Sequence, residues 1–364
     1  MLIVGITGNY GMGKSAVLSM FRELGAVTID ADWVVGQLLK EKKVLGQVKK
    51  LFGSGILDKK GQLDKKKVSE KIFKSKSLRL KLEDLLHPLV FKRIDEFIKG
   101  YKDGKKVFIV EAPVIFEREY EGRFDKTVTV FTDETTAINR LSMLGVTAKT
   151  ASERLRCQLP IKEKIKRADF SIDNSGRIEK TKKQVEGVYK KLLEEAKIKE
   201  LLYAGNVKDI KKILGRPYSI EGRVIKGAGR GGKLLHTPTA NIAIENGTPI
   251  KEGVYAVRVG IAETGKKRRG DRGKQKITAS PIQRFTYSPI YDGVANIGKN
   301  PTFGASVVSY EVHIFNFSGN LLGQKLRVYF ISRIRDEKKF PSVKALETRI
   351  KKDIKKAKEI LERG

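Results

Sequence analysis

The sequence lacks the cysteines, long apolar runs and leader segment that mark secreted and membrane proteins. It contains one cysteine, Cys157, among 364 residues, so no disulfide can form within the chain. No apolar run approaches the roughly 18 residues of a membrane-spanning helix, and the first residues show no secretory leader. These absences exclude a disulfide-stapled or integral membrane protein, and they lead us to expect a cytoplasmic one.

Acidic residues are also scarce, since 42 Asp and Glu stand against 75 Lys and Arg, for a net charge of +33. A charge of this size attracts phosphates, nucleic acids and anionic surfaces whatever the function. The lysines occur in pairs and triplets on stretches with helical periodicity, such as 65–67 and 351–352, which is typical of a solvated helix face. With no zinc-finger spacing and no interleaved exposed aromatics, we expect small anionic substrates and no specific nucleic-acid partner.

The length predicts two domains, and the patterning changes where they would meet. Up to about residue 203, apolar strands alternate with helices, which predicts an α/β domain with a parallel sheet covered on both faces. The strands expected there are Leu2–Thr7, Ala26–Ile29, Val107–Val110 and Thr127–Phe131. We set this domain at 1–203 and a linker or helical lead-in at 204–215.

The remaining part, 216–364, is rich in Gly and Thr and has short alternating segments. Strands expected here include Val254–Val259, Val307–Phe315 and Lys325–Phe330, followed by a helix over Ser342–Glu362. The pattern predicts an antiparallel Greek-key β-barrel with a C-terminal helix. The polar stretch 262–287 predicts an extended basic loop.

A phosphate-binding loop follows the first strand. Gly8, Gly11, Gly13, Lys14 and Ser15 satisfy the pattern G-x-x-x-x-G-K-[ST] between a predicted strand and a predicted helix. Its backbone N–H groups converge on phosphate oxygens, the lysine places a charge on the β and γ phosphates, and the serine hydroxyl can hold Mg²⁺. We therefore predict ATP binding with Mg²⁺ here.

Two carboxylates, Asp30 and Asp32, end the second predicted strand, on the side where the phosphates would lie. Either could accept the proton of a hydroxyl during phosphoryl transfer, and their spacing does not choose between them. Asp30 is a further candidate for substrate or Mg²⁺ contact. His87, in the sequence Leu86-His87-Pro88, is read either as a ring fixed by its neighbour or as a substrate contact.

The motifs of this half, taken in their order along the chain, resemble those of dephospho-CoA kinase. The resemblance is carried by the phosphate-binding loop, by Ile29-Asp30-Ala31-Asp32, by Leu86-His87-Pro88-Leu89-Val90, by Glu111-Ala112-Pro113-Val114-Ile115-Phe116-Glu117, by Arg154 with Gln158 and Lys164, and by Asp173-Asn174. It implies that Asp32 is the base acting on the 3′-hydroxyl of dephospho-CoA and that Arg140 and Arg154 belong to a lid over ATP. Gly36, Phe91 and Leu144 stand where the family usually carries a basic residue.

The second half has its own Gly-rich turn, with Gly227, Gly229 and Gly231, followed by Pro238-Thr239-Ala240-Asn241. Because Thr239 and Asn241 are two apart on an extended segment, both can present oxygens to one Mg²⁺ and its nucleotide. Glu311 is a carboxylate within an apolar and aromatic strand. That setting makes it a candidate general base, with a salt-bridge partner on an edge strand as the alternative.

These motifs, with Asn300-Pro301-Thr302-Phe303 and Arg333-Ile334-Arg335-Asp336-Glu337, resemble the riboflavin kinase domain. The resemblance implies that Glu311 deprotonates the 5′-hydroxyl of riboflavin, that Thr239 and Asn241 hold MgATP, and that the Arg335 region covers the flavin. His236 departs from the usual glycine. No H-x-G-H adenylyltransferase signature is present, so FMN is the expected product.

The sequence thus predicts a fusion of two small-molecule kinases that make FMN and coenzyme A. One alternative is a riboflavin kinase whose N-terminal domain binds nucleotide without catalysis, which the missing basic residues favour. An alternative of another class is a basic nucleic-acid-binding regulator with a flavin-sensing domain, which the charge favours.

Overall fold

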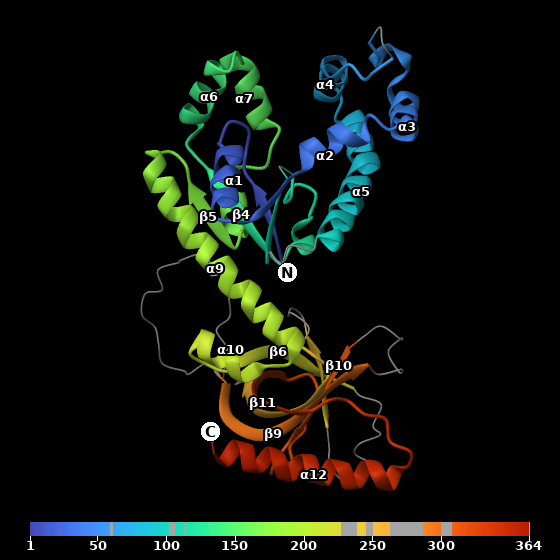
Figure 1. The fold of residues 1–364 in the computed structure, drawn as a ribbon, viewed down its shortest axis with the longest axis vertical. Coiled ribbons are helices and arrows are strands. Elements are labelled where there is room, and N and C mark those ends of the chain that lie inside the picture. Colours follow the sequence, from blue (N-terminus) through green and yellow to red (C-terminus); the bar gives the residue numbers. More distant parts are fainter. Residues whose placement is uncertain are drawn as a thin grey trace, which may run out of the picture. The chain divides into compact units, whose positions relative to one another are not determined.

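The computed structural model describes residues 1–58, 61–101, 106–112, 114–226, 239–244, 250–262, 287–299 and 308–363. The chain forms two compact units, Met1–Ala196 and Lys197–Gly364 (Figure 1). Within the described ranges, no helix has the length and apolar character needed to cross a membrane.

A five-stranded parallel sheet in the order β2-β3-β1-β4-β5 forms the centre of the N-terminal unit. Its strands are β1 (Leu2–Thr7), β2 (Val27–Asp30), β3 (Val107–Glu111), β4 (Lys126–Phe131) and β5 (Phe170–Asp173). The central strands β1 and β3 are nearly continuously apolar because both faces of a parallel sheet are covered. In β3, Val107 and Ile109 pack against one set of helices, whereas Phe108 and Val110 pack against another. The predicted α/β architecture is confirmed.

Helices supply the two covering layers of this sheet. One layer contains α1 (Lys14–Glu23) and α9 (Ile178–Ala204), and the other contains α2 (Ala31–Leu38), α3 (Lys42–Phe52) and α5 (Lys76–Gly100). The other helices are α4 (Lys65–Lys74), α6 (Glu134–Met143), α7 (Ala148–Arg156) and α8 (Ile161–Arg167), with short 3₁₀ turns at Ser54–Ile56 and Glu121–Arg123. Figure 1 shows α6 and α7 side by side, across from α2 and α5.

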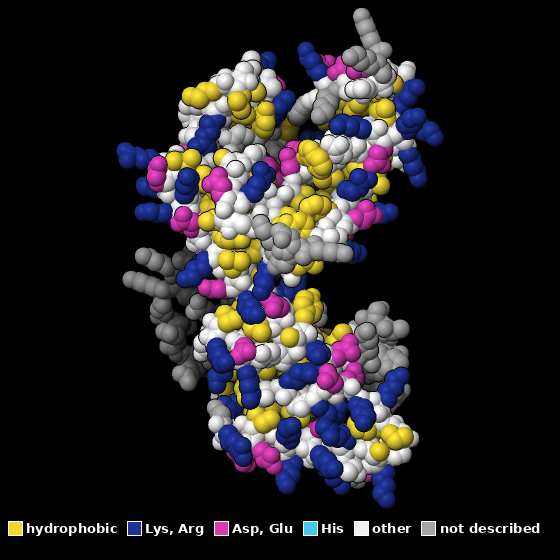
Figure 2. All heavy atoms as spheres, in the orientation of Figure 1, with side chains coloured by type: hydrophobic (Ala, Val, Ile, Leu, Met, Phe, Trp, Pro, Cys, Tyr) yellow, Lys and Arg dark blue, Asp and Glu magenta, His cyan; other side chains and the backbone are white. Residues whose placement is uncertain are grey.

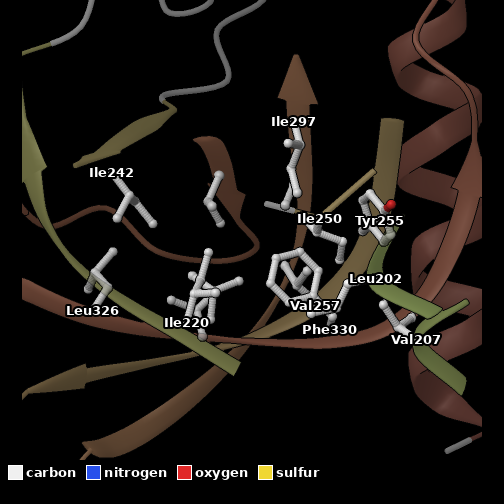
Figure 3. Packing of buried hydrophobic residues seen from close by; sticks show 14 of the residues in the cluster. Leu202, Val207, Ile220, Ile242, Ile250, Tyr255, Val257, Ile297, Leu326 and Phe330 are labelled. Atoms are coloured by element: carbon white, nitrogen blue, oxygen red, sulfur yellow. The ribbon is translucent and has the colours of Figure 1, made fainter. Parts of the chain in front are cut away.

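The C-terminal unit is a closed antiparallel barrel in the order β10-β7-β6-β11-β8-β9. Its strands are β6 (Tyr218–Ile225), β7 (Ala240–Ile244), β8 (Gly253–Ala262), β9 (Tyr287–Lys299), β10 (Val308–Ile314) and β11 (Lys325–Arg335). Alternate side chains fill the interior, including Ile220, Val257, Ile297, Leu326 and Phe330 (Figure 3). This confirms the predicted barrel class.

Helical residues before the barrel also belong to its core. Leu201 and Leu202, from the end of α9, are buried in the same cluster as the barrel interior, with Val207 and Ile210 from α10 (Val207–Leu214). The C-terminal unit therefore begins at Lys197, within α9, whereas we expected its lead-in to start at 204. The boundary falls inside a continuous helix, where no Gly or Pro marks the point at which α9 stops packing on the N-terminal sheet and starts packing on the barrel.

The C-terminal helix α12 (Val343–Glu362) covers the outer face of the barrel. Its Ala357 and Leu361 pack with Val254 and Ala256 of β8. Ser342 accepts a hydrogen bond from the Ala345 N–H and so caps the first turn, which explains why the helix begins where the sequence predicts.

Candidate active site

The phosphate-binding loop ends in a helix start that only glycine allows easily. Gly13 precedes α1 with φ 82°, and a Cβ there would lie 2.2 Å from the side-chain nitrogen of Asn174. A Cβ on Gly8 would lie 2.3 Å from the Val130 carbonyl oxygen. No side chain caps α1, so its first N–H groups have no side-chain partner there. The backbone thus presents the N–H cradle that a phosphate needs.

Lys14 bends back over this loop. Its Nζ donates to the carbonyl oxygen of Gly8 at 3.0 Å. Burial lowers the pKa of Lys14, and the nearby Glu111 opposes this decrease. Burial in turn raises the pKa of Glu111, the last residue of β3, while Lys14 lowers it. A cation and a carboxylate therefore lie in one partly dehydrated site.

The two aspartates after β2 have different surroundings. One oxygen of Asp30 accepts the N–H of Asp32 at 2.8 Å and that of Trp33 at 3.1 Å, so Asp30 is the N-cap of α2. Asp32 lies in the first turn and lines the cavity described next, which Asp30 does not. The structure therefore separates the two carboxylates, which spacing did not: Asp32 faces the cavity and Asp30 caps the helix.

A cavity of about 780 Å³ brings most of the predicted N-terminal residues together. Its lining includes Gly11, Gly13, Lys14, Ser15, Asp32, Arg140 and Arg154. These come from the phosphate-binding loop and from α1, α2, α6 and α7, and Figure 2 shows the surface hollowed between the α6–α7 pair and the α2–α5 side. Loop glycines, a lysine, a hydroxyl, a carboxylate and two guanidinium groups thus face one space.

The two predicted lid arginines are held in different ways. Arg154 donates to the Tyr10 hydroxyl at 2.9 Å, and its guanidinium carbon lies 5.0 Å from the centre of that ring. Arg140 donates from Nη2 to the Asn174 carbonyl at 2.8 Å. Its Nη1 is buried with no hydrogen-bond partner among the described residues. That nitrogen is a donor suited to an anion entering the cavity.

His87 does not line the cavity. It lies inside α5 and its Nδ1 is 3.0 Å from the Tyr120 hydroxyl, with the two rings edge to face. Burial lowers the pKa of His87 to about 4. This neighbourhood supports the structural reading of His87.

In the barrel, strand register brings two predicted residues together. Glu311 of β10 is the direct partner of Asn241 of β7, which places their side chains on the same face about 5 Å apart at Cβ. Their strand neighbours Val312 and Ala240 face the apolar core, so this pair faces the other way. Thr239 is exposed just before β7. A carboxylate thus lies beside an amide, next to a hydroxyl-bearing residue.

Arg335 ends β11 and contacts α12. Its Nε and Nη2 lie 2.8 and 2.7 Å from one oxygen of Asp353, and Nη1 donates to the Asp336 carbonyl. Asp353 is 4% exposed. In this structure Arg335 ties the closing helix to the barrel. Several other sites lie outside the described residues: Gly227, Gly229, Gly231, His236, Asn300–Phe303 and most of 262–287.

Comparisons with known proteins match both halves. Residues 2–180 match the family model for dephospho-CoA kinase, and residues 214–361 match that for riboflavin kinase. Dephospho-CoA kinase from Aquifex aeolicus is 39% identical over 190 residues, which are 52% of this chain and 96% of that protein. The chain belongs to the dephospho-CoA kinase family. It carries a riboflavin kinase domain fused after that family's domain.

Solved structures resemble each part. Dephospho-CoA kinase from Campylobacter jejuni is 25% identical, covering 52% of this chain and 96% of that one, with a TM-score of 0.40. Riboflavin kinase from Trypanosoma brucei is 21% identical, covering 40% of this chain and 78% of that one, with a TM-score of 0.28.

Gly36, Phe91 and Leu144 are the three positions where the resemblance to dephospho-CoA kinase led us to expect a basic residue. One of them lines the cavity. That one is Leu144, which is 79% exposed at the end of α6. Phe91 instead packs on Tyr120, with the Arg123 guanidinium carbon 4.3 Å from the centre of its ring. A Cβ on Gly36 would have no atom within 4 Å. Only Leu144 therefore changes the wall of this cavity.

Sequence reasoning quoted Glu111, Glu117 and Lys164 as motif residues but gave them no place in the site. Lys164 is fully buried and lies 2.7 Å from one oxygen of Glu117, while the other oxygen is buried without a partner among the described residues. Both Glu111 and Glu117 line the cavity. The sequence feature that could have indicated them is their position. Glu111 ends an apolar strand, and Glu117 lies in the turn that follows.

The donor set around the phosphate-binding loop fits Mg²⁺. Ser15, Asp32 and Glu111 supply one hydroxyl and two carboxylates to one cavity. Among the described residues there is no cluster of three or more His, Cys, Asp or Glu able to hold a metal alone. Mg²⁺ suits such a sparse site because it keeps several waters and shares the phosphates of its nucleotide.

Proposed function

We propose that the N-terminal unit transfers the γ-phosphoryl group of ATP to the 3′-hydroxyl of dephospho-CoA, and that the C-terminal unit transfers it to the 5′-hydroxyl of riboflavin. The observation that carries the first activity is the cavity in which Lys14, Asp32 and Arg140 meet. Membership in two kinase families implies ATP as the donor. Both reactions consume ATP, and we expect them in the cytoplasm.

In the N-terminal unit, phosphoryl transfer depends on positioning and on charge. The loop N–H groups and Lys14 hold the β and γ phosphates. Ser15, Asp32 and Glu111 would hold Mg²⁺, which would neutralise charge on those phosphates. Asp32 accepts the proton of the acceptor hydroxyl. The free Nη1 of Arg140 donates to the transferring group as the lid residues enclose it.

In the barrel, Glu311 accepts the proton of the riboflavin hydroxyl, beside Asn241 and Thr239, which hold MgATP. The support is the direct pairing of Glu311 with Asn241. Glu311 lies on the face turned away from the apolar core, where substrate can approach. The expected product is FMN.

A second candidate is a riboflavin kinase with an N-terminal unit that binds nucleotide only. Leu144 favours it, because this apolar side chain lines the cavity where the family usually has a cation. The structure gives less support to the hypothesis of a nucleic-acid-binding regulator. On the face shown in Figure 2, Lys and Arg are dispersed over both units among Asp and Glu.

The test is to incubate the full chain with MgATP and either riboflavin or dephospho-CoA, and to identify FMN and coenzyme A by mass spectrometry. Both products are expected. Formation of FMN without coenzyme A, at saturating dephospho-CoA, would establish the single-activity candidate instead.

A further inference from the structure

Tyr10 is a residue of the phosphate-binding loop that has no part in the reaction proposed above. It occupies a position that the pattern G-x-x-x-x-G-K-[ST] leaves open, and it lines the cavity. Its backbone N–H donates to Oε1 of Gln158 at 2.8 Å, and its hydroxyl accepts a hydrogen bond from Nη1 of Arg154 at 2.9 Å. The Arg154 guanidinium carbon also lies 5.0 Å from the centre of the tyrosine ring. One loop residue thus makes three contacts with the segment at the end of α7.

Local structure places the two partners of Tyr10 on one side of this segment. Arg154 lies in the last turn of α7, and Gln158 follows four residues later, with its N–H donating to the Leu155 carbonyl at 3.1 Å. The helical path continues past the end of α7 because its C-cap residue, Cys157, keeps right-handed helical dihedral angles. Residues four apart on a helical path share a face, so Arg154 and Gln158 both reach the cavity.

The turn that carries Gln158 is itself anchored to the phosphate-binding loop and to the turn after β3. The Asn9 side chain donates to the carbonyl oxygen of Leu159 at 3.1 Å, and the N–H of Leu159 donates to Oε1 of Glu117 at 3.2 Å. The same oxygen is 2.7 Å from Nζ of Lys164, which is fully buried. Hydrogen bonds in such a partly dehydrated setting are stronger than in water. The turn is therefore a fixed support for the loop.

The contact with Tyr10 restrains an arginine that must still meet an anion. A guanidinium group has five N–H donors in a planar fork, so a hydroxyl that accepts from one nitrogen does not exclude a phosphate. A long side chain that is already held also loses less conformational freedom when its ligand binds. Arg140 is held differently, through the backbone carbonyl of Asn174. A substitution at position 10 therefore acts on Arg154 and leaves the Arg140 contact in place.

We propose that Tyr10 is a positioning residue that holds the Arg154 guanidinium over the phosphate-binding loop, so that the arginine meets the phosphates of ATP already oriented. Gln158 assists by fixing the backbone of Tyr10. This inference rests on the proposed function of the N-terminal unit, in which Arg154 is a lid residue. The hydroxyl of Tyr10 should then contribute to ATP affinity only while the arginine is present.

The experiment is a double-substitution cycle on the full chain, followed by calorimetric titration with MgATP. Lys14→Ala supplies the baseline, since the ATP binding that it removes belongs to the N-terminal unit. Tyr10→Phe keeps the ring and removes the hydroxyl, and it should weaken this binding about threefold to tenfold, a loss typical of one hydrogen bond. In a chain that already carries Arg154→Gln, the same change should alter the dissociation constant by less than about twofold, because the two residues act as a pair.

Tyr189→Phe is the matched control. Tyr189 packs on the core of the same unit and does not line the cavity, so its substitution should leave ATP binding unchanged in both backgrounds. Equal weakening by Tyr10→Phe with and without Arg154, or no weakening at all, would overturn the inference.

Steady-state kinetics supply a second measurement. Tyr10→Phe should raise the KM for ATP in coenzyme A formation, while the KM for dephospho-CoA and the rate of FMN formation stay the same. ATP binding that shows the expected coupling, without any coenzyme A formation, would defeat the proposed function alone. Coenzyme A formation with a KM for ATP that Tyr10→Phe leaves unchanged would defeat the inference alone.

Discussion

The two candidate sites collect their residues by different routes. In the N-terminal unit, Gly8, Asp30 and Glu111 stand at or just after the ends of three parallel strands, and the sheet brings them to one edge. In the barrel, Asn241 and Glu311 meet because two antiparallel strands pair in one register. The first arrangement tolerates changes in the segments between strands, whereas the second depends on register. The two sites should therefore fail separately and for different reasons.

The largest expected effect separates the two activities. Lys14→Ala removes the cation over the phosphate-binding loop, and we expect coenzyme A formation to fall below detection. Asp32→Asn keeps the shape and removes the proton acceptor, so kcat should fall by about 10² to 10⁴. FMN formation by the same protein is the internal control and should be unchanged. A parallel loss of FMN would show that the sites are not separate.

The mirror experiment acts on the barrel. Glu311→Gln should lower the kcat for FMN formation by about 10² to 10⁴, because the amide cannot accept the hydroxyl proton. Flavin binding, which fluorescence quenching measures, should persist because the side chain keeps its shape. Near-normal turnover would remove Glu311 from the mechanism, and coenzyme A formation should not change in either case.

A substitution in one unit should also change the stability of that unit alone. Lys164→Met leaves the carboxylate of Glu117 buried without its cation, a change that costs about 3 to 5 kcal/mol in comparable buried pairs. We expect the unfolding transition of the N-terminal unit to move to much lower temperature while that of the barrel stays. Lys166→Met, at an exposed position of α8, is the control. The double variant Lys164→Met with Glu117→Gln should recover part of the loss.

The dephospho-CoA kinase motifs allowed the sequence to locate much of this site. The start of α1 followed from the Gly13-Lys14 pattern, because a left-handed glycine and an N–H cradle are local features. The partner of Lys164 did not follow, because Glu117 is distant in the sequence and no local pattern links them. The cavity-lining cations of α5, Lys76 and Arg79, were hidden for another reason: in a chain with 75 Lys and Arg, a cationic helix face carries little information.

The barrel shows a different limit. The strand around Glu311 followed from its alternation, and β10 covers Val308–Ile314. Its partner did not follow, since register depends on connections that the alternation does not encode. Arg335 was read as a residue that covers the flavin, yet its ion pair with Asp353 could be found only once α12 was placed.

A smaller effect concerns Leu144. Leu144→Arg restores a cation on the wall of the cavity and should lower the KM for at least one substrate of the N-terminal unit. Because this position is 79% exposed, solvent weakens the contact, and we expect about a threefold to tenfold change. Met143→Arg is the matched control, since Met143 is 86% exposed and does not line the cavity. Equal effects of the two changes would indicate general charge attraction.

The smallest effect depends on pH and on His87. Burial lowers the pKa of His87 from 6.5 to about 4 in the folded state, so between these values the unfolded chain binds a proton that the folded unit does not. Stability from the neutral ring is therefore present above pH 6.5 and declines as the pH falls toward 4. The side chain is partly exposed, so the expected loss between pH 7 and pH 5 is about 1 kcal/mol. Urea unfolding of the N-terminal unit at both pH values, for the natural chain and for His87→Gln, measures this difference. If the two proteins lose the same stability on acidification, His87 keeps an ordinary pKa and its burial does not hold it neutral.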